Sequence, residues 1–157
     1  MTATTTTAFR IHAVPAEALD RARRTGKPTR IVAGGGEPVR CCLRDAEPGE
    51  ELILFNYEPP IPGTDSPYQE TGAVYAHAEP CAGPPEHGAY PQDWRGRPQV
   101  LRAYDERGWI HEATRVHDGQ DPEGAIAAVL AENGVVEVHS RNIDYGCFMF
   151  AATSARA

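Results

Sequence analysis

The sequence predicts an α+β fold, in which a largely antiparallel sheet of six to seven strands carries two main helices packed on one face. Helical periodicity appears in only two segments, whereas alternating or continuously apolar runs typical of strands recur along the chain. Several of these runs are separated by turn sequences short enough for hairpins, and hairpins make antiparallel pairs. Few helices among many strands therefore indicate the α+β class.

The first half of the chain is expected to form four strands and the first helix. Phe9–Val14 alternates in hydropathy, and Pro15 then suits the first turn of a helix that runs to about Arg24. The glycines at 34–36 lack the residues that complete a phosphate-binding loop. Three further runs are typical of strands, and they are Thr29–Val32, Glu51–Tyr57 and Ala73–Ala78.

The second half is expected to form two hairpins around the second helix. Asp121 is a favoured helix N-cap residue, and Pro122 suits the first helical position. An Asn-Gly pair at 133–134 should end this helix. The strands of the first hairpin are Val100–Asp105 and Trp109–His117, and those of the last are Val135–Asn142 and Tyr145–Ala151.

A length of 157 residues predicts a single domain, which we place at 9–152. The Thr/Ala-rich segment 1–8 is expected to be a disordered N-terminal tail, and 153–157 a flexible C-terminal tail. Segment 1–8 also lacks the positive and apolar regions of a signal peptide, which predicts a cytoplasmic protein.

The charge balance excludes two classes of partner. The chain has 22 acidic against 15 basic residues and a net charge of −7, which argues against binding to nucleic acid. No apolar stretch approaches the roughly 20 residues that a membrane helix needs, so no membrane association is expected. Edge strands could pair between copies, which leaves a homo-oligomer open.

Organic cofactors are not expected. Lys27 is the only lysine, and it lies in a Gly-Lys-Pro turn, which disfavours Schiff-base chemistry. The sequence contains no dinucleotide or phosphate-loop motif. Arginine is therefore the main cationic side chain, and its planar fork suits a carboxylate or phosphate ligand. A small anionic organic ligand or substrate is the expected partner.

Polar side chains share strand faces at positions where a simple core would carry aliphatic residues. Tyr75 and His77 lie on one face by alternation, and Arg102 lies on the strand that Asp105 ends. In the last hairpin, a three-residue loop at 142–144 would place His139 opposite Cys147 and Arg141 opposite Tyr145. A Cys–His pair at that distance can form a thiolate nucleophile, although buried structural roles suit both residues equally well.

A zinc site is a further alternative. His77, Cys81, His139 and Cys147 offer nitrogen and sulfur donors of the kind that tetrahedral zinc prefers. The adjacent pair Cys41-Cys42 is interpreted as structural, because neighbours on a strand point to opposite faces and would not share one site.

Four ordered blocks of the sequence follow a pattern that a known family shares. The blocks are Arg40–Glu50 with Leu52–Leu54 and Tyr57, Ser66–Tyr68 with Val74–His77, Leu101–Asp105, and Val138–Asn142 with Gly146–Phe148. In these blocks the chain resembles an uncharacterised bacterial family, domain of unknown function 1203. The family tends to carry a cysteine where this chain has Val39, and often a second histidine where it has Arg141. The resemblance implies a role for the polar positions in the blocks, which are Arg40, Tyr68, His77, Arg102, Asp105, His139 and Cys147.

These observations predict a small cytoplasmic enzyme without an organic cofactor. It would act on a small anionic organic molecule in a biosynthetic pathway, by lyase, isomerase, cyclase or hydrolase chemistry that uses acid–base or Cys–His groups. The alternatives are a protein that binds or sequesters the ligand without turnover, and the zinc-binding protein. The candidate catalytic residues are His139, Cys147, His77 and Asp105, and the candidate substrate-binding residues are Arg40, Arg102, Tyr68, Tyr75 and Arg141.

Overall fold

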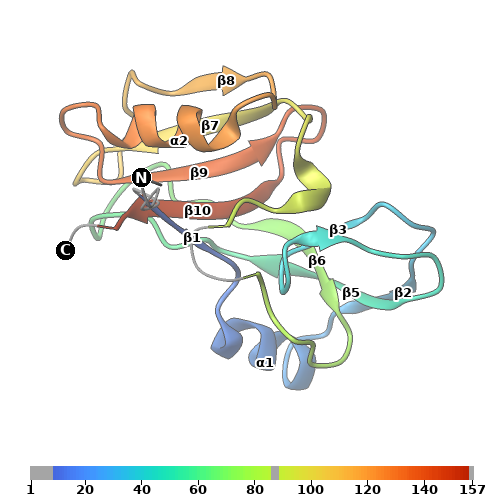
Figure 1. Ribbon diagram of the computed structural model, residues 1–157. Coiled ribbons are helices and arrows are strands. Elements are labelled where there is room, and N and C mark those ends of the chain that lie inside the picture. Colours follow the sequence, from blue (N-terminus) through green and yellow to red (C-terminus); the bar gives the residue numbers. More distant parts are fainter. Residues whose placement is uncertain (1–8, 86–88, 156–157) are drawn as a thin grey trace.

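Two five-stranded sheets, each accompanied by one helix, make up the fold (Figure 1). The structure is a computed structural model that describes residues 9–85 and 89–155, so the predicted tail at 1–8 lies outside it. Within the described residues there are ten strands and two α-helices, and all but one strand pairing is antiparallel. The α+β class is confirmed. The single sheet with both helices on one face is wrong, because the strands divide between two sheets with separate cores.

The first sheet, here named the β6 sheet, has the order β2-β5-β6-β3-β4. Its helix α1 (Ala16–Arg24) buries Leu19 and Ala22 in the core of this sheet. The apolar run predicted as a strand is β5, which buries Leu52 and Ile53 completely. The strands are β2 (Thr29–Val32), β3 (Pro38–Val39), β4 (Arg44–Asp45), β5 (Glu51–Tyr57) and β6 (Gly72–His77).

The second sheet, here named the β9 sheet, has the order β1-β10-β9-β7-β8 and is antiparallel throughout. Helix α2 (Pro122–Leu130) covers it, and Asp121 caps this helix by accepting a hydrogen bond from the Gly124 N–H. The last strand reaches Ser154, so 153 and 154 belong to the sheet and not to a tail. The strands are β1 (Phe9–His12), β7 (Gln99–Tyr104), β8 (Arg115–His117), β9 (Glu137–Asn142) and β10 (Phe148–Ser154).

The β9–β10 hairpin has a longer loop and a different register than the sequence predicts. Arg141 pairs with Phe148 and His139 pairs with Ala151, with an irregularity between Phe148 and Phe150. A shift in register changes which side chains lie opposite each other. The two predicted pairs are therefore wrong, and these are Arg141 with Tyr145 and His139 with Cys147.

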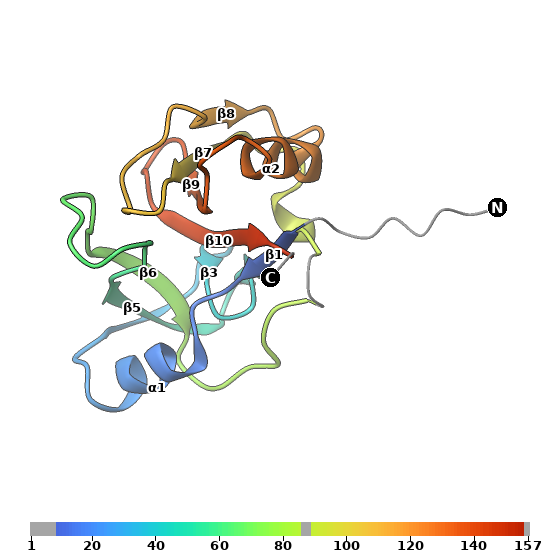
Figure 2. The same ribbon diagram turned by 90° about the vertical axis from the view of Figure 1, so that its left-hand side faces the viewer.

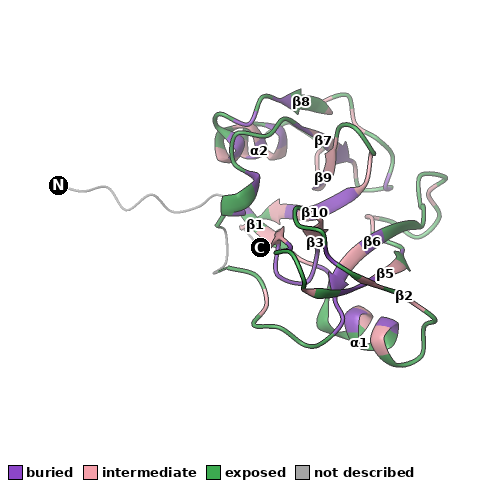
Figure 3. Ribbon diagram, turned by 90° about the vertical axis from the view of Figure 1, so that its right-hand side faces the viewer, coloured by how far each residue is buried: buried purple, intermediate pink, exposed green. Residues whose placement is uncertain are grey.

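The two sheets interlock where β10 meets the β3–β4 turn (Figures 1 and 2). Phe148 of β10 packs into the core of the β6 sheet, whereas Leu43 of the β3–β4 turn packs into the core of the β9 sheet. Buried residues therefore continue from one layer into the other (Figure 3). Within the described residues, neither nine-residue helix has the length to cross a membrane.

His117 at the end of β8 should make stability depend on pH. Its side chain is 7% exposed and its Nδ1 accepts the Gly119 N–H, and burial lowers its pKa below the ordinary value. The unfolded chain therefore binds a proton at His117 more readily than the folded chain does. The stability that the neutral His117 contributes is fully present above about pH 6.5 and is lost as the pH falls through the folded-state pKa.

We expect His117→Asn to lose less stability than the wild type when the pH falls from about 7.5 to about 5.5, measured by urea denaturation at both pH values. Equal losses in the two proteins would contradict this role. His12→Asn is the control, because the His12 side chain is solvent-accessible and bonds to Thr153.

Candidate functional site

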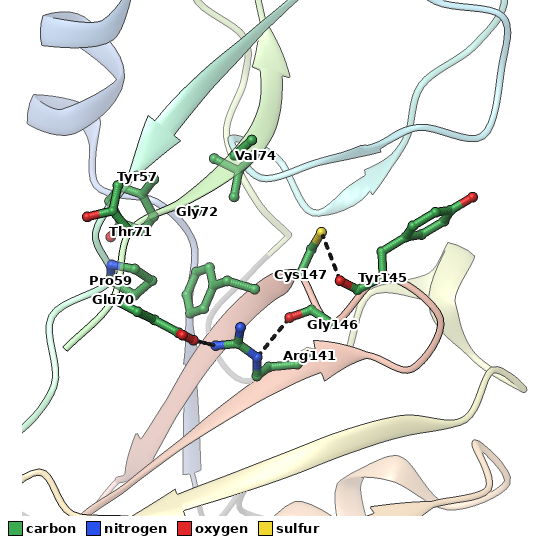
Figure 4. A pocket seen from close by; sticks show the side chains of 12 residues that line it. Tyr57, Pro59, Glu70, Thr71, Gly72, Val74, Arg141, Tyr145, Gly146 and Cys147 are labelled. Atoms are coloured by element: carbon green, nitrogen blue, oxygen red, sulfur yellow. Dashed lines mark hydrogen bonds and ion pairs between the residues drawn. The ribbon is translucent and has the colours of Figure 1, made fainter. Parts of the chain in front are cut away.

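A cleft of about 560 Å³ lies between the two sheets, where the β9–β10 loop faces β6 and β3. A smaller pocket of about 170 Å³ adjoins it and shares Ala73, Tyr145 and Cys147 with it. Figure 4 shows that the Cys147 sulfur points toward the β6 side, where Val74 lies, while the Tyr145 ring points away. The side chains that line the larger cleft include Glu37, Pro38, Arg40, Tyr75, Tyr145 and Cys147.

The loop that carries Cys147 is held by its own hydrogen bonds. The Asn142 Oδ1 accepts the N–H groups of Tyr145 and Cys147, and the Asn142 N–H donates to the Cys147 carbonyl. Arg141 Nε donates to the Gly146 carbonyl at 2.9 Å. An Asn side chain that accepts nearby backbone N–H groups stabilises a turn. This bonding explains the longer loop, and it fixes Cys147 in the cleft.

Arg40 is the buried cation of the cleft. Its side chain is 1% exposed, and it donates to the Phe148 carbonyl at 2.7 Å and to the Pro38 carbonyl. Burial lowers the pKa of Arg40 to about 10, whereas electrostatic interactions with Cys147 and Tyr75 act in the opposite direction. The cation therefore lines the same cleft as the Cys147 side chain.

The other two arginines assigned to a ligand are already paired. Glu70 Oε1 lies 2.6 Å from Arg141 Nη1 and 3.3 Å from Arg102 Nη1. Figure 4 shows the Arg141–Glu70 pair at the edge of the smaller pocket. Both guanidinium groups therefore have a carboxylate partner within the protein, which leaves Arg40 as the arginine that lines the larger cleft.

Three further predicted residues have local structural partners. His139 is 1% exposed, and its Nε2 lies 2.5 Å from Glu137 Oε2 between the rings of Tyr104 and Phe148. Asp105 accepts the N–H groups of the turn after β7 and pairs with Arg107, which lowers the Asp105 pKa. The last of the three, Tyr68, packs edge-on against the Trp109 ring. Their catalytic and binding roles remain predictions.

A cluster of three cysteines and one histidine lies next to the cleft. The donor atoms of Cys41, Cys42, His77 and Cys81 all lie within 4.8 Å of one another. His77 Nδ1 is 3.2 Å from Cys41 Sγ and 3.6 Å from Cys42 Sγ, and the two sulfur atoms are 3.9 Å apart. All but Cys81 are buried.

Charged groups surround the other side of His77. Its Nε2 lies 3.1 Å from Glu50 Oε2, and Arg44 forms two hydrogen bonds with the same carboxylate. Arg44 lowers the pKa of Glu50 to about 2. Hydrogen bonding between the thiols lowers the pKa of Cys41 to about 5 and raises that of Cys42, so one negative charge is favoured on the pair.

The four residues that the sequence offers as zinc donors do not all lie together. His77 and Cys81 converge, but their partners are Cys41 and Cys42 in place of His139 and Cys147. The rule for neighbours on a strand does not apply to this pair, because 40–43 form the turn between β3 and β4, where Leu43 has φ +56°. The turn is the Arg-Cys-Cys-Leu segment, which joins the two-residue strands β3 and β4. These residue types alone do not indicate a turn.

A family model described as protein of unknown function (DUF1203) matches residues 36–153. This range includes the thiol cluster and every residue that lines the larger cleft except Gly35. No curated protein and no solved structure matches the chain.

Proposed function

The chain belongs to the DUF1203 family, which assigns no reaction, and we propose that it is a small enzyme without an organic cofactor that uses Cys147 as a nucleophile. The observation that carries this proposal is that the buried Arg40 guanidinium and Cys147 line the same cleft and interact electrostatically. A cation beside a cysteine favours the thiolate, which is the nucleophilic form.

The cleft supports a small organic substrate. Its volume of about 560 Å³ falls in the range typical of small-molecule sites, about 300–1,000 Å³. Tyr75 and Asn142 line the same cleft and offer polar groups that would orient a substrate, and Arg40 would favour one that carries negative charge. The sequence analysis assigned the role of the cation near the Cys147 sulfur to His139. In this proposal the Arg40 guanidinium has that role.

The reaction that fits these groups is acyl transfer to water. The thiolate of Cys147 forms a C–S bond with a carbonyl carbon, and the leaving group departs with the electron pair of the broken bond and takes a proton from water. Water then adds to the thioester, the C–O bond forms, and the C–S bond breaks to return the thiolate. Arg40 stabilises the negative charge on sulfur at the start and at the end.

The activated ester 4-nitrophenyl acetate tests this proposal. We expect a burst of about one nitrophenolate per chain, followed by slower turnover, because the acyl-enzyme accumulates. Cys147→Ser should abolish the burst while its thermal unfolding stays close to that of the wild type, since the Cys147 side chain is half-buried at a loop. Mass spectrometry of the quenched protein should find the acetyl group on Cys147.

Two results would overturn the proposal that the chain is an enzyme. One is a burst of equal size in Cys147→Ser, and the other is no acetylation of Cys147 in the wild type at any substrate concentration. A cleft that only sequesters a ligand would give the second result.

A further inference from the structure

The thiol cluster beside the cleft has the composition and the geometry of a metal centre. From its four donors we propose that Cys41, Cys42, His77 and Cys81 bind one Zn²⁺ ion in a closed tetrahedral site. Three cysteines and one histidine form one of the common structural zinc sites, whose four protein ligands leave no position for a substrate. The proposed ion therefore has a structural role, separate from the chemistry at Cys147.

Three of the distances between donors are close to those that a zinc tetrahedron requires, and all four donor atoms lie within 4.8 Å of one another. Bonds of about 2.3 Å to sulfur and about 2.0 Å to nitrogen place two sulfur atoms roughly 3.8 Å apart and a sulfur and a nitrogen roughly 3.5 Å apart. The Cys41 and Cys42 sulfur atoms are 3.9 Å apart, and His77 Nδ1 is 3.6 Å from Cys42 and 3.2 Å from Cys41. Binding thus needs only small movements of these side chains.

The surroundings of His77 orient it as a metal ligand. Glu50 Oε2 and Arg44 Nη2 both lie 3.1 Å from His77 Nε2. The tautomer that donates from Nε2 to Glu50 leaves the Nδ1 lone pair for a metal ion, on the side where the Cys41 and Cys42 sulfur atoms lie. A carboxylate behind the ligating histidine is typical of zinc sites and increases the basicity of the ligand. The pattern is stronger than a chance group of thiols, because it extends to the neighbours of the donors.

The backbone and a nearby cation support the charge of such a site. Three thiolates and Zn²⁺ carry a net charge of −1, and the Arg44 guanidinium lies beside the site, with its Nη2 3.1 Å from His77 Nε2. The His77 N–H also donates to the Cys41 sulfur at 3.2 Å. These contacts hold Cys41 and Cys42 on the turn at 40–43 and His77 at the end of β6. Cys81, in the loop that follows β6, is the fourth donor.

A matched pair of cysteine variants tests the site. The wild-type chain, expressed with zinc and purified under reducing conditions without chelator, should contain about one zinc per chain by elemental analysis. Cys81→Ser should lose it, and because Cys81 is exposed, circular dichroism should find the fold retained. Cys147→Ser is the control that keeps the metal, since Cys147 lies outside the cluster. Cobalt(II) added to the apo protein should give the tetrahedral thiolate spectrum with the control and not with Cys81→Ser.

Three outcomes would overturn the proposal. They are a wild-type chain that takes up neither zinc nor cobalt, a Cys81→Ser variant that binds as tightly as the wild type, and a disulfide among the three cluster cysteines in the reduced preparation. None of these depends on the 4-nitrophenyl acetate burst, so failure of the zinc site and failure of the enzyme can be distinguished.

Discussion

Replacing Trp94 with Ala should destabilise the protein by about 3–5 kcal/mol, the range for deletion of a large buried aromatic side chain. Trp94 is fully buried, and its ring stacks on Phe150 of the β9 sheet at 6.3 Å between centroids. Its Nε1 donates to Asp45 Oδ1 of the β6 sheet at 3.0 Å. One side chain thus contacts both sheets, and its loss leaves a cavity and a partly buried carboxylate with one donor fewer.

Urea denaturation of Trp94→Ala and Trp109→Ala measures this effect with a matched control. Trp109 is 41% exposed, and its ring contacts Tyr68 and Arg107, so its loss should cost no more than about 1 kcal/mol. Similar losses in the two variants would contradict the bridging role of Trp94.

Replacing Arg40 with Met should lower the free energy of unfolding by about 3 kcal/mol. The guanidinium donates to carbonyls of both sheets, Pro38 in β3 and Phe148 in β10, and hydrogen bonds to charged groups contribute about 1.5–3 kcal/mol each. Met fills a similar volume and makes neither bond. The two carbonyls would then be buried without these donors.

The control for this experiment is Arg30→Met, because Arg30 is an exposed residue of β2 whose replacement should change stability by less than about 0.5 kcal/mol. Equilibrium urea denaturation measures both variants. If Arg40→Met were as stable as the wild type, the desolvation of the buried charge would offset its hydrogen bonds, and the cation would be retained for the cleft and not for the fold.

Local patterns in the sequence predict the elements well, because each depends on near neighbours. β2 and β5 begin and end where the hydropathy pattern places them, and Asp121 caps α2 as its side chain predicts. The division into two sheets depends on contacts between distant residues such as Arg40 and Phe148, which no local pattern contains. The register of the last hairpin was wrong for a local reason, because the Asn142 side chain bonds to the N–H groups of Tyr145 and Cys147 and so decides the length of the loop.

The candidate site was predictable in its residue types more than in their partners. Arg40, Tyr75 and Cys147 all line the cleft, as their assignment to one site implies. The thiol cluster could not be predicted without knowing that Cys41 and Cys42 lie in a turn. In this turn the backbone leaves the strand conformation on which the alternation rule depends.

The strand order has a consequence for how the chain assembles during synthesis. All five strands of the β6 sheet lie between 29 and 77, so this sheet can form as soon as that stretch has left the ribosome. Among the described residues, strand β1 pairs only with β10, the strand farthest from it in the sequence, so this pair forms after the strands between them have been made. Contacts this distant in sequence form slowly, because a long loop must close first. The β9 sheet is therefore the last to close, and until then Arg40 lacks its Phe148 acceptor and the cleft does not exist.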